Sequence, residues 1–197
     1  AINGSTLYAG GFLTTVNGSI PRNGIAAFDL TTGNVTSWDP NISTGYVKTL
    51  AINGNSLYAG GSFTYAAGVP RNMLVEIDLS TGLATAWNPN MNGLVNAIAI
   101  NGGTLYAGGT FTTGGGQSRN KLVALDLASG LATGWNPMID GDVNALAVDG
   151  STIYAGGNFT ISGTRNRLAA FDMATGTATS WNPNIGGVVK TICLNGS

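Results

Sequence analysis

An internal repeat of about 48 residues limits this chain to folds built from near-identical units. The motif Ala-Ile/Val-Asn/Asp-Gly-x-x-Leu/Ile-Tyr-Ala-Gly-Gly begins at Ala1, Ala51, Ala99 and Ala147. Cys193 starts a fifth copy, and the offset from position 1 to position 193 corresponds to four periods. Such units bury a core only by stacking on their neighbours. We predict one repeat domain spanning 1-197, with repeats 1-50, 51-98, 99-146 and 147-192, and a copy at 193-197 that overlaps the first.

Turn signals divide each repeat into four short apolar runs and leave no window for a helix. Asn-Gly and Asp-Gly steps such as Asn53-Gly54 favour hairpins because both residues tolerate positive φ. The third run reads Leu74-Val75-Glu76-Ile77, so apolar side chains point to both faces, as in a sheet covered on both sides. The pattern predicts an all-β fold, a β-propeller of four-stranded antiparallel blades. In the second repeat we expect strands around 48–52, 57–64, 73–79 and 83–87.

Each repeat also carries one Arg and, seven positions later, one Asp. A buried charge needs a partner, so we expect the Arg to pair with this Asp or to bond loop carbonyls within its blade. A ring of four arginines around a ligand is the alternative interpretation. The recurring residues are Arg22, Arg71, Arg119, Arg165, Asp29, Asp78, Asp126 and Asp172.

A single Trp near the end of each repeat is predicted to pack between blades. It follows a Thr-Gly or Ser-Gly turn and stands beside a Pro turn, where its large apolar area can cover a neighbour. A sugar-stacking platform is the alternative. These residues are Trp38, Trp87, Trp135 and Trp181. The small residues of Tyr-Ala-Gly-Gly suit a close approach of backbone or a bulge.

Two resemblances add to this interpretation. The segment Asp29-Leu30-Thr31-Thr32-Gly33 followed by Trp38 resembles the tryptophan-docking motif of quinoprotein propellers, in which the Trp packs against the adjacent blade. The whole repeat, with Phe-Thr, Arg-Asn, Asp, Thr-Gly and Trp-x-Pro, resembles repeats of secreted bacterial surface β-propeller proteins. The second resemblance covers the full chain and implies a propeller at a cell surface.

The composition excludes several functional classes. The chain has 8 Lys plus Arg, 9 Asp plus Glu, no His and one Cys. Eight scattered cations cannot form the basic stripe of a nucleic-acid binder. Without His, a Ser–His–Asp set and His-based acid–base catalysis are impossible, and one Cys cannot form a disulfide framework. We therefore expect no enzyme activity and no cofactor.

One segment superficially matches a calcium loop. Asp140, Asp142 and Asn144 alternate as calcium ligands do, but the later Gly and the twelfth-position Glu of an EF-hand are missing. We therefore expect no metal site, and these three residues are the alternative, a calcium candidate. Cys193 stands in the slot of Ala51, which predicts a small core residue.

The favoured function is a non-enzymatic extracellular structural or adhesion module, a rigid propeller unit of a cell-surface or filament-forming protein. The alternative is a carbohydrate-binding, lectin-like propeller that uses the loops between the second and third strands. Expected partners are further copies of the chain, other surface proteins or glycans, with no nucleic acid and no membrane insertion. Three closures stay open: a four-bladed ring, two chains in an eight-bladed ring, or a longer array.

Overall fold

The computed structural model describes residues 1–161 and 165–195, and all regular secondary structure in these residues is β-strand. Three-stranded antiparallel sheets recur along the chain, one for each repeat. We call each sheet with its following loop a blade. The chain divides into two compact units, residues 1–90 and 91–197, and each unit contains two blades. Within the described ranges no helix is long and apolar enough to cross a membrane.

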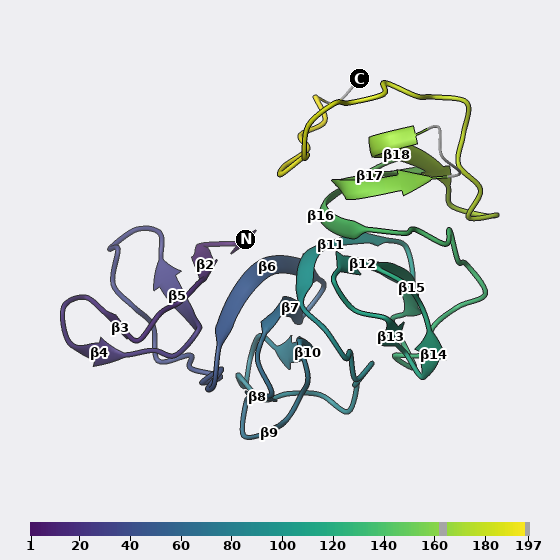
Figure 1. Cartoon of the computed structure of the whole chain (residues 1–197). Helices are drawn as coiled ribbons and strands as arrows, with labels where there is room; N and C mark the ends of the chain where they lie inside the picture. The colour runs from purple at the N-terminus through teal and green to yellow at the C-terminus, as the bar shows by residue number, and fades with distance from the viewer. Residues whose placement is uncertain (162–164, 196–197) are drawn as a thin grey trace. The chain divides into compact units, whose positions relative to one another are not determined.

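The first unit holds blades one and two (Figure 1). In each blade the second strand lies between the first and the third. A two-stranded hairpin follows the second strand and projects from the blade. Blade one consists of β1 (Ile2–Asn3), β2 (Thr6–Gly10) and β5 (Ile25–Asp29), with the hairpin β3 (Thr15–Val16) and β4 (Ile20–Pro21). Blade two consists of β6 (Tyr46–Asn53), β7 (Ser56–Ser62) and β10 (Leu74–Asp78), with the hairpin β8 (Tyr65–Ala66) and β9 (Val69–Pro70).

The second unit holds blades three and four in the same order (Figure 1). Blade three consists of β11 (Val95–Asn101), β12 (Thr104–Gly109) and β15 (Leu122–Asp126), with the hairpin β13 (Thr113–Gly114) and β14 (Gln117–Ser118). Blade four consists of β16 (Asp142–Asp149), β17 (Thr152–Ile161) and β18 (Arg165–Asp172).

The predicted fourth strand of each blade is reduced to one bridge. Ile77 pairs with Ala84, and the amide of Thr85 donates to the Glu76 carbonyl at 3.0 Å. The bridge forms directly after a tight turn, and the chain then leaves the sheet to place Trp87. Too few residues lie between these two features for a longer ladder. The equivalent bridges are Phe28–Val35, Leu125–Ala132 and Phe171–Ala178.

The Gly-Gly step serves both roles that the sequence suggests. A Cβ atom on Gly108 would overlap the side chain of Val143, which belongs to the next blade. A Cβ atom on Gly109 would overlap the backbone carbonyl of Leu94, at the start of the same blade, where the β11–β12 register shifts. The first glycine therefore allows two blades to pack closely, and the second accommodates a bulge.

Each unit has its own apolar core between its two sheets. In the first unit it includes Leu57, Val75 and Ile77, and in the second it includes Leu122, Ile153 and Phe171. The prediction that Cys193 is a core residue is wrong, because its thiol is exposed. Residues 189–195 run past blade four without forming a strand, which leaves this position uncovered. Positions 196 and 197 of the predicted fifth copy lie outside the described residues.

Candidate functional site

The four recurring arginines bond backbone carbonyls, which is one of the two arrangements predicted for them. Nη2 of Arg119 donates to the Thr133 carbonyl at 2.7 Å, and Nη1 donates to the Ser118 carbonyl at 2.9 Å. The guanidinium therefore joins the projecting hairpin to the segment that leads to the Trp. The equivalent bonds from Nη2 are Arg22 to Thr36 at 2.6 Å, Arg71 to Thr85 at 2.6 Å and Arg165 to Thr179 at 2.7 Å.

The recurring aspartates organise the turn that follows the third strand. Oδ1 of Asp78 accepts hydrogen bonds from the amide and the hydroxyl of Thr81, at 2.8 and 3.0 Å. These bonds, the amide bond first, hold the pKa of Asp78 below its usual range, and the same holds for the pKa of Asp29 with Thr32. The hydroxyls of Ser129 and Thr175 have the larger effect in lowering the pKa of Asp126 and Asp172.

Trp38 and Trp135 dock on the next blade of their own unit. Nε1 of Trp135 donates to the backbone carbonyl of Asp172 at 3.0 Å, and Nε1 of Trp38 donates to that of Asp78 at 3.5 Å. A Cβ atom on Gly176 would lie 3.3 Å from the Trp135 ring, so the turn glycine keeps this approach open. The packing predicted between blades is therefore confirmed for these two residues. Trp87 is also buried, whereas Trp181 is 44% exposed.

Each tryptophan also meets the tyrosine of its own blade edge to face. The ring centroids lie 5.1 to 5.4 Å apart in the four blades, an arrangement that aromatic pairs favour. The tyrosines are Tyr8, Tyr58, Tyr106 and Tyr154. The sequence shows these tyrosines in the Tyr-Ala-Gly-Gly motif but does not indicate that they contact the Trp.

The three residues of the candidate calcium site have different partners. Oδ1 of Asp140 accepts from the Thr160 amide at 2.7 Å, and Asp142 lies 3.4 Å from Nζ of Lys121. Nδ2 of Asn144 donates to the Val189 carbonyl at 3.1 Å. Over residues 1–161 and 165–195, no group of three His, Cys, Asp or Glu residues is arranged to hold a metal ion. Each of the three candidate ligands is thus engaged by a different group, and calcium binding there stays a prediction.

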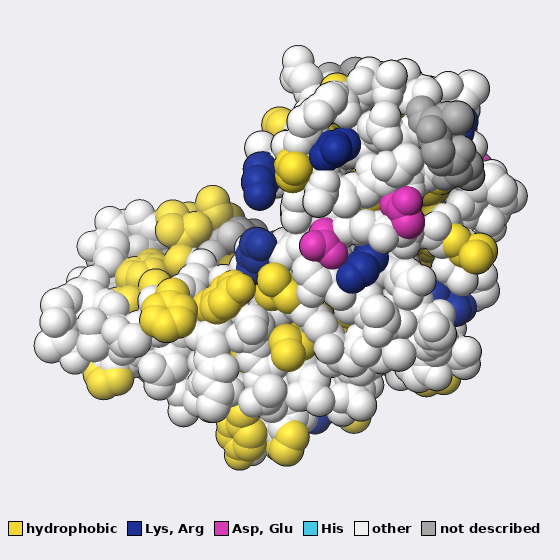
Figure 2. Space-filling model, viewed as in Figure 1, with side chains coloured by type: hydrophobic (Ala, Val, Ile, Leu, Met, Phe, Trp, Pro, Cys, Tyr) yellow, Lys and Arg dark blue, Asp and Glu magenta, His cyan; other side chains and the backbone are white. Residues whose placement is uncertain are grey.

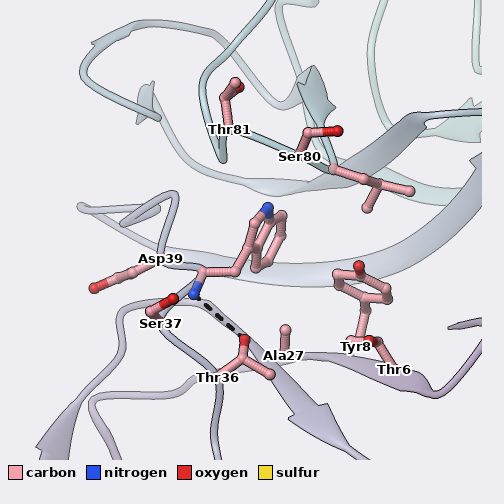
Figure 3. A pocket seen from close by; sticks show the side chains of 10 residues that line it. Thr6, Tyr8, Ala27, Thr36, Ser37, Asp39, Ser80 and Thr81 are labelled. Atoms are coloured by element: carbon pink, nitrogen blue, oxygen red, sulfur yellow. Dashed lines mark hydrogen bonds between the residues drawn. The ribbon is translucent and has the colours of Figure 1, made fainter.

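A pocket of about 370 Å³ lies in the first unit, beside Trp38 (Figure 3). Thr6, Tyr8, Ala27 and Thr36 form one side of it, and Ser80 and Thr81 face them from blade two. Most polar groups that line the pocket are hydroxyls. Burial raises the pKa of Tyr8, and a hydrogen bond from Thr6 acts in the opposite direction. The sequence offers no motif for this pocket.

In blade two a glutamate stands at the position that Ala27 has in blade one. Glu76 pairs with Tyr58 in the β7–β10 register, just as Ala27 pairs with Tyr8 in the β2–β5 register. The Glu76 carboxylate accepts hydrogen bonds from the hydroxyls of Ser56 at 2.6 Å, Tyr58 at 2.9 Å and Thr85 at 2.5 Å. Burial raises the pKa of Tyr58, and the Glu76 carboxylate raises it further.

This geometry defines a β-propeller module, and the comparisons with known proteins agree. Residues 74–197 match the family model described as the Rax2 C-terminal beta propeller domain. The match covers more than half of the chain, which therefore belongs to this family. The all-β propeller fold and membership of a β-propeller family are confirmed, whereas the resemblance to the repeats of secreted bacterial surface proteins stays a prediction. No curated protein matches the sequence.

Solved structures support the fold at low sequence identity. The computationally designed Ika8 protein has a TM-score of 0.65 at 12% identity, over 99% of this chain and 51% of that chain. The designed Ika4 protein has a TM-score of 0.53 at 14% identity, over 77% and 81%. The Cps50 (Swd1) beta-propeller domain from Myceliophteria thermophila has a TM-score of 0.58 at 15% identity, over 86% and 52%. The chain spans about half the length of the Ika8 and Swd1 chains.

Proposed function

We propose that this chain is a non-enzymatic extracellular structural or adhesion module, a propeller that presents variable hairpins to a partner at a cell surface. The observation that carries this proposal is that recurring residues make the structural contacts of each blade, whereas the projecting hairpins vary. The residues that recur are bonded within a blade or to the next one, as Arg119 and Trp135 are. The projecting hairpins, by contrast, differ in sequence from blade to blade.

The hairpins differ in chemistry from blade to blade. Ile20 is 36% exposed in the β3–β4 hairpin, and Tyr65 is 40% exposed in the β8–β9 hairpin. The β13–β14 hairpin carries Gln117 and Ser118 where the β3–β4 hairpin carries Ile20 and Pro21, and both residues are exposed. On the face seen in Figure 2, charged side chains are few, and hydrophobic side chains are exposed among uncharged side chains and backbone. Such a surface suits contact with proteins or glycans rather than with a polyanion.

Binding to intact cells tests this proposal. Labelled chain is added to cells of the organism that produces it, and bound fluorescence is measured against concentration. We expect saturable binding that falls at least severalfold when residues 65–70 are replaced by the sequence of 113–118. Leu83→Ser serves as the control, because Leu83 is exposed at a site outside the hairpins. Binding that survives exchange of every hairpin, or no saturable binding, would contradict the proposal.

A glycan array separates adhesion to protein from the lectin-like alternative. The exposed Tyr65 ring, whose hydroxyl donates to the Gly68 carbonyl at 2.7 Å, offers a fixed aromatic face of the kind that stacks on sugars. Glycan binding that disappears in Tyr65→Ser would establish the lectin-like function. A blank array together with saturable cell binding would support a protein partner, and light scattering would show whether that partner is a second copy.

A further inference from the structure

Blade two shows what kind of group fits beside the Trp-bearing turn. Three neutral hydroxyls, from Ser56, Tyr58 and Thr85, hold the carboxylate of Glu76. Hydrogen bonds that involve an ionised acceptor are about twice as strong as neutral ones. Three such donors compensate a half-buried carboxylate for lost contacts with water. Blade two therefore contains a carboxylate-binding site formed by three hydroxyls, and the Glu76 side chain occupies it.

Blade one has the same donors without the occupant. Thr6, Tyr8 and Thr36 correspond to the three hydroxyl residues of blade two, and Ala27 stands in place of Glu76. All four of these residues line the 370 Å³ pocket (Figure 3). What Ala27 lacks relative to glutamate is one methylene and a carboxylate, which together have the size of an acetate ion. The pocket has room for this group and for more.

A hydrogen bond from the backbone orients the Thr36 hydroxyl of the pocket as a donor. The Trp38 amide donates to Oγ1 of Thr36 at 3.3 Å, so the hydroxyl proton of Thr36 must point elsewhere (Figure 3). The Trp87 amide donates to Oγ1 of Thr85 at 3.2 Å in the same way, and the proton of Thr85 goes to Glu76. This equivalence favours an acceptor, rather than another donor, in the pocket of blade one.

We propose that the blade-one pocket binds a small hydroxylated carboxylate, such as a sugar acid. Its carboxylate takes the place that the Glu76 carboxylate has in blade two and accepts from Thr6, Tyr8 and Thr36. Its hydroxylated body extends along Trp38 toward Ser80 and Thr81. The site is separate from the projecting hairpins, so it goes beyond the adhesion function and does not depend on it.

Asp39 at the rim of the pocket predicts the direction in which one substitution should change carboxylate binding. Its carboxylate lies 3.5 Å from Nη1 of Arg22, whose Nη2 donates to the Thr36 carbonyl, and it extends away from the hydroxyls in Figure 3. Blade two has the neutral Asn88 at this position. An exposed charge of the same sign opposes an anionic ligand only modestly. Asp39→Asn should therefore strengthen carboxylate binding by about two- to fivefold.

An NMR titration with sodium acetate tests the proposal directly. The backbone amides of Thr36 and Trp38 should shift saturably with acetate and not with sodium chloride at equal ionic strength. Glucuronate should bind at least as tightly as acetate, and glucose should not bind. Equal responses to acetate and chloride would overturn the proposal. Binding of glucose with no response to acetate would overturn the assignment of a carboxylate.

Two further variants locate the site. Ala27→Glu supplies the missing carboxylate, so it should abolish the acetate response at Thr36 while Leu30→Glu, the same charge at an exposed position of blade one, preserves it. Glu76→Ala creates the open position in blade two, and acetate should restore more of its lost melting temperature than chloride or acetamide does. An unchanged acetate response in Ala27→Glu, or no specific rescue of Glu76→Ala, would contradict the proposal.

Discussion

Each recurring arginine places a full positive charge against a backbone carbonyl rather than against the aspartate seven positions later in its repeat. A carbonyl presents a partial negative charge, and two of them match the planar fork of the guanidinium. Because Arg119 and Thr133 are 14 residues apart in the chain, the bond closes a loop that would otherwise move independently. The charge therefore stabilises local structure through the backbone carbonyls that it joins.

Arg119→Ala should lower the free energy of unfolding by about 1–3 kcal/mol, because two carbonyls lose their donors in a half-buried place. Lys190→Ala removes the same charge from an exposed position and should change stability by less than about 0.5 kcal/mol. Urea unfolding followed by circular dichroism measures both. Equal stability of Arg119→Ala and the unmodified chain would show that these bonds contribute nothing.

The sequence predicted that the arginine bonds within its blade but did not decide between carbonyl and carboxylate. Both partners lie at suitable spacing, and only the structure shows that the Asp78 carboxylate is held by Thr81. The blade-one pocket was missed for a related reason. Its one signal is Ala27 at the place of Glu76, and a difference between repeats has no meaning until the register aligns the two strands.

At the scale of the structural elements, the turn after each third strand makes the free energy of unfolding depend on pH. The four turn aspartates have lowered pKa values in the folded chain. A lowered folded-state pKa adds stability above the unfolded pKa of about 4, and this contribution disappears as the pH falls through the folded value. The turns should therefore hold at neutral pH and weaken in acid.

The free energy of unfolding should stay constant from about pH 7 to 5 and fall below about pH 4. Asp172→Asn should lower stability at pH 7 and make the fall in acid shallower, because the amide keeps one acceptor but does not titrate. Thermal unfolding at a series of pH values, repeated in high salt to screen net charge, measures this. An identical acid dependence in Asp172→Asn would contradict the explanation.

The Gly-Gly step should tolerate no side chain at its second position. Gly109→Ala forces a Cβ atom into the Leu94 carbonyl and should lower the free energy of unfolding by about 1–3 kcal/mol or more. Gly103→Ala, in the hairpin turn of the same blade, meets nothing within 4 Å and should be nearly neutral. Melting temperatures of the two variants provide the comparison. A stable Gly109→Ala chain would mean that the bulge can move.

The strand pattern was predictable where turns punctuate the sequence and failed where strands are very short. The Asn53-Gly54 step marks the β6–β7 hairpin, and Asn53 indeed pairs with Ser56. In hairpins of two-residue strands, such as β8–β9, the strands are too short to show an alternation of apolar and polar residues. The fourth strand was overestimated because Ala84 and its neighbours have strand-like residues but only one position to pair.

At the scale of the whole molecule, one tryptophan adds a hydrogen bond to the apolar core that joins the two blades of each unit. Trp135 fills the space beside the turn of the next blade and donates to its backbone. The repeat predicts this contact because every unit carries both halves of it, the Trp and the turn. The same local contact serves rings with different numbers of blades, so the repeat alone does not fix that number.

Trp135→Phe should lower the free energy of unfolding by about 1–3 kcal/mol, since the indole hydrogen bond and part of the packed ring are lost. Trp181→Phe should cost less than about 0.5 kcal/mol, because this ring is 44% exposed. Calorimetry of the two variants tests the difference. Equal losses would mean that Trp135 acts through its own blade, as Trp181 does with Tyr154.

Glu76 also shows that a single residue difference between repeats decides whether a blade carries its own carboxylate at this position. Ala124 and Ala170 stand at the same register position in the other blades, opposite Tyr106 and Tyr154. An Ala-to-Glu substitution at either place would put a carboxylate opposite the tyrosine, as Glu76 does in blade two. Because the repeated scaffold places the same tyrosine opposite this position in every blade, a change of one residue can alter the chemistry of one blade while the strands and turns of the others stay unchanged.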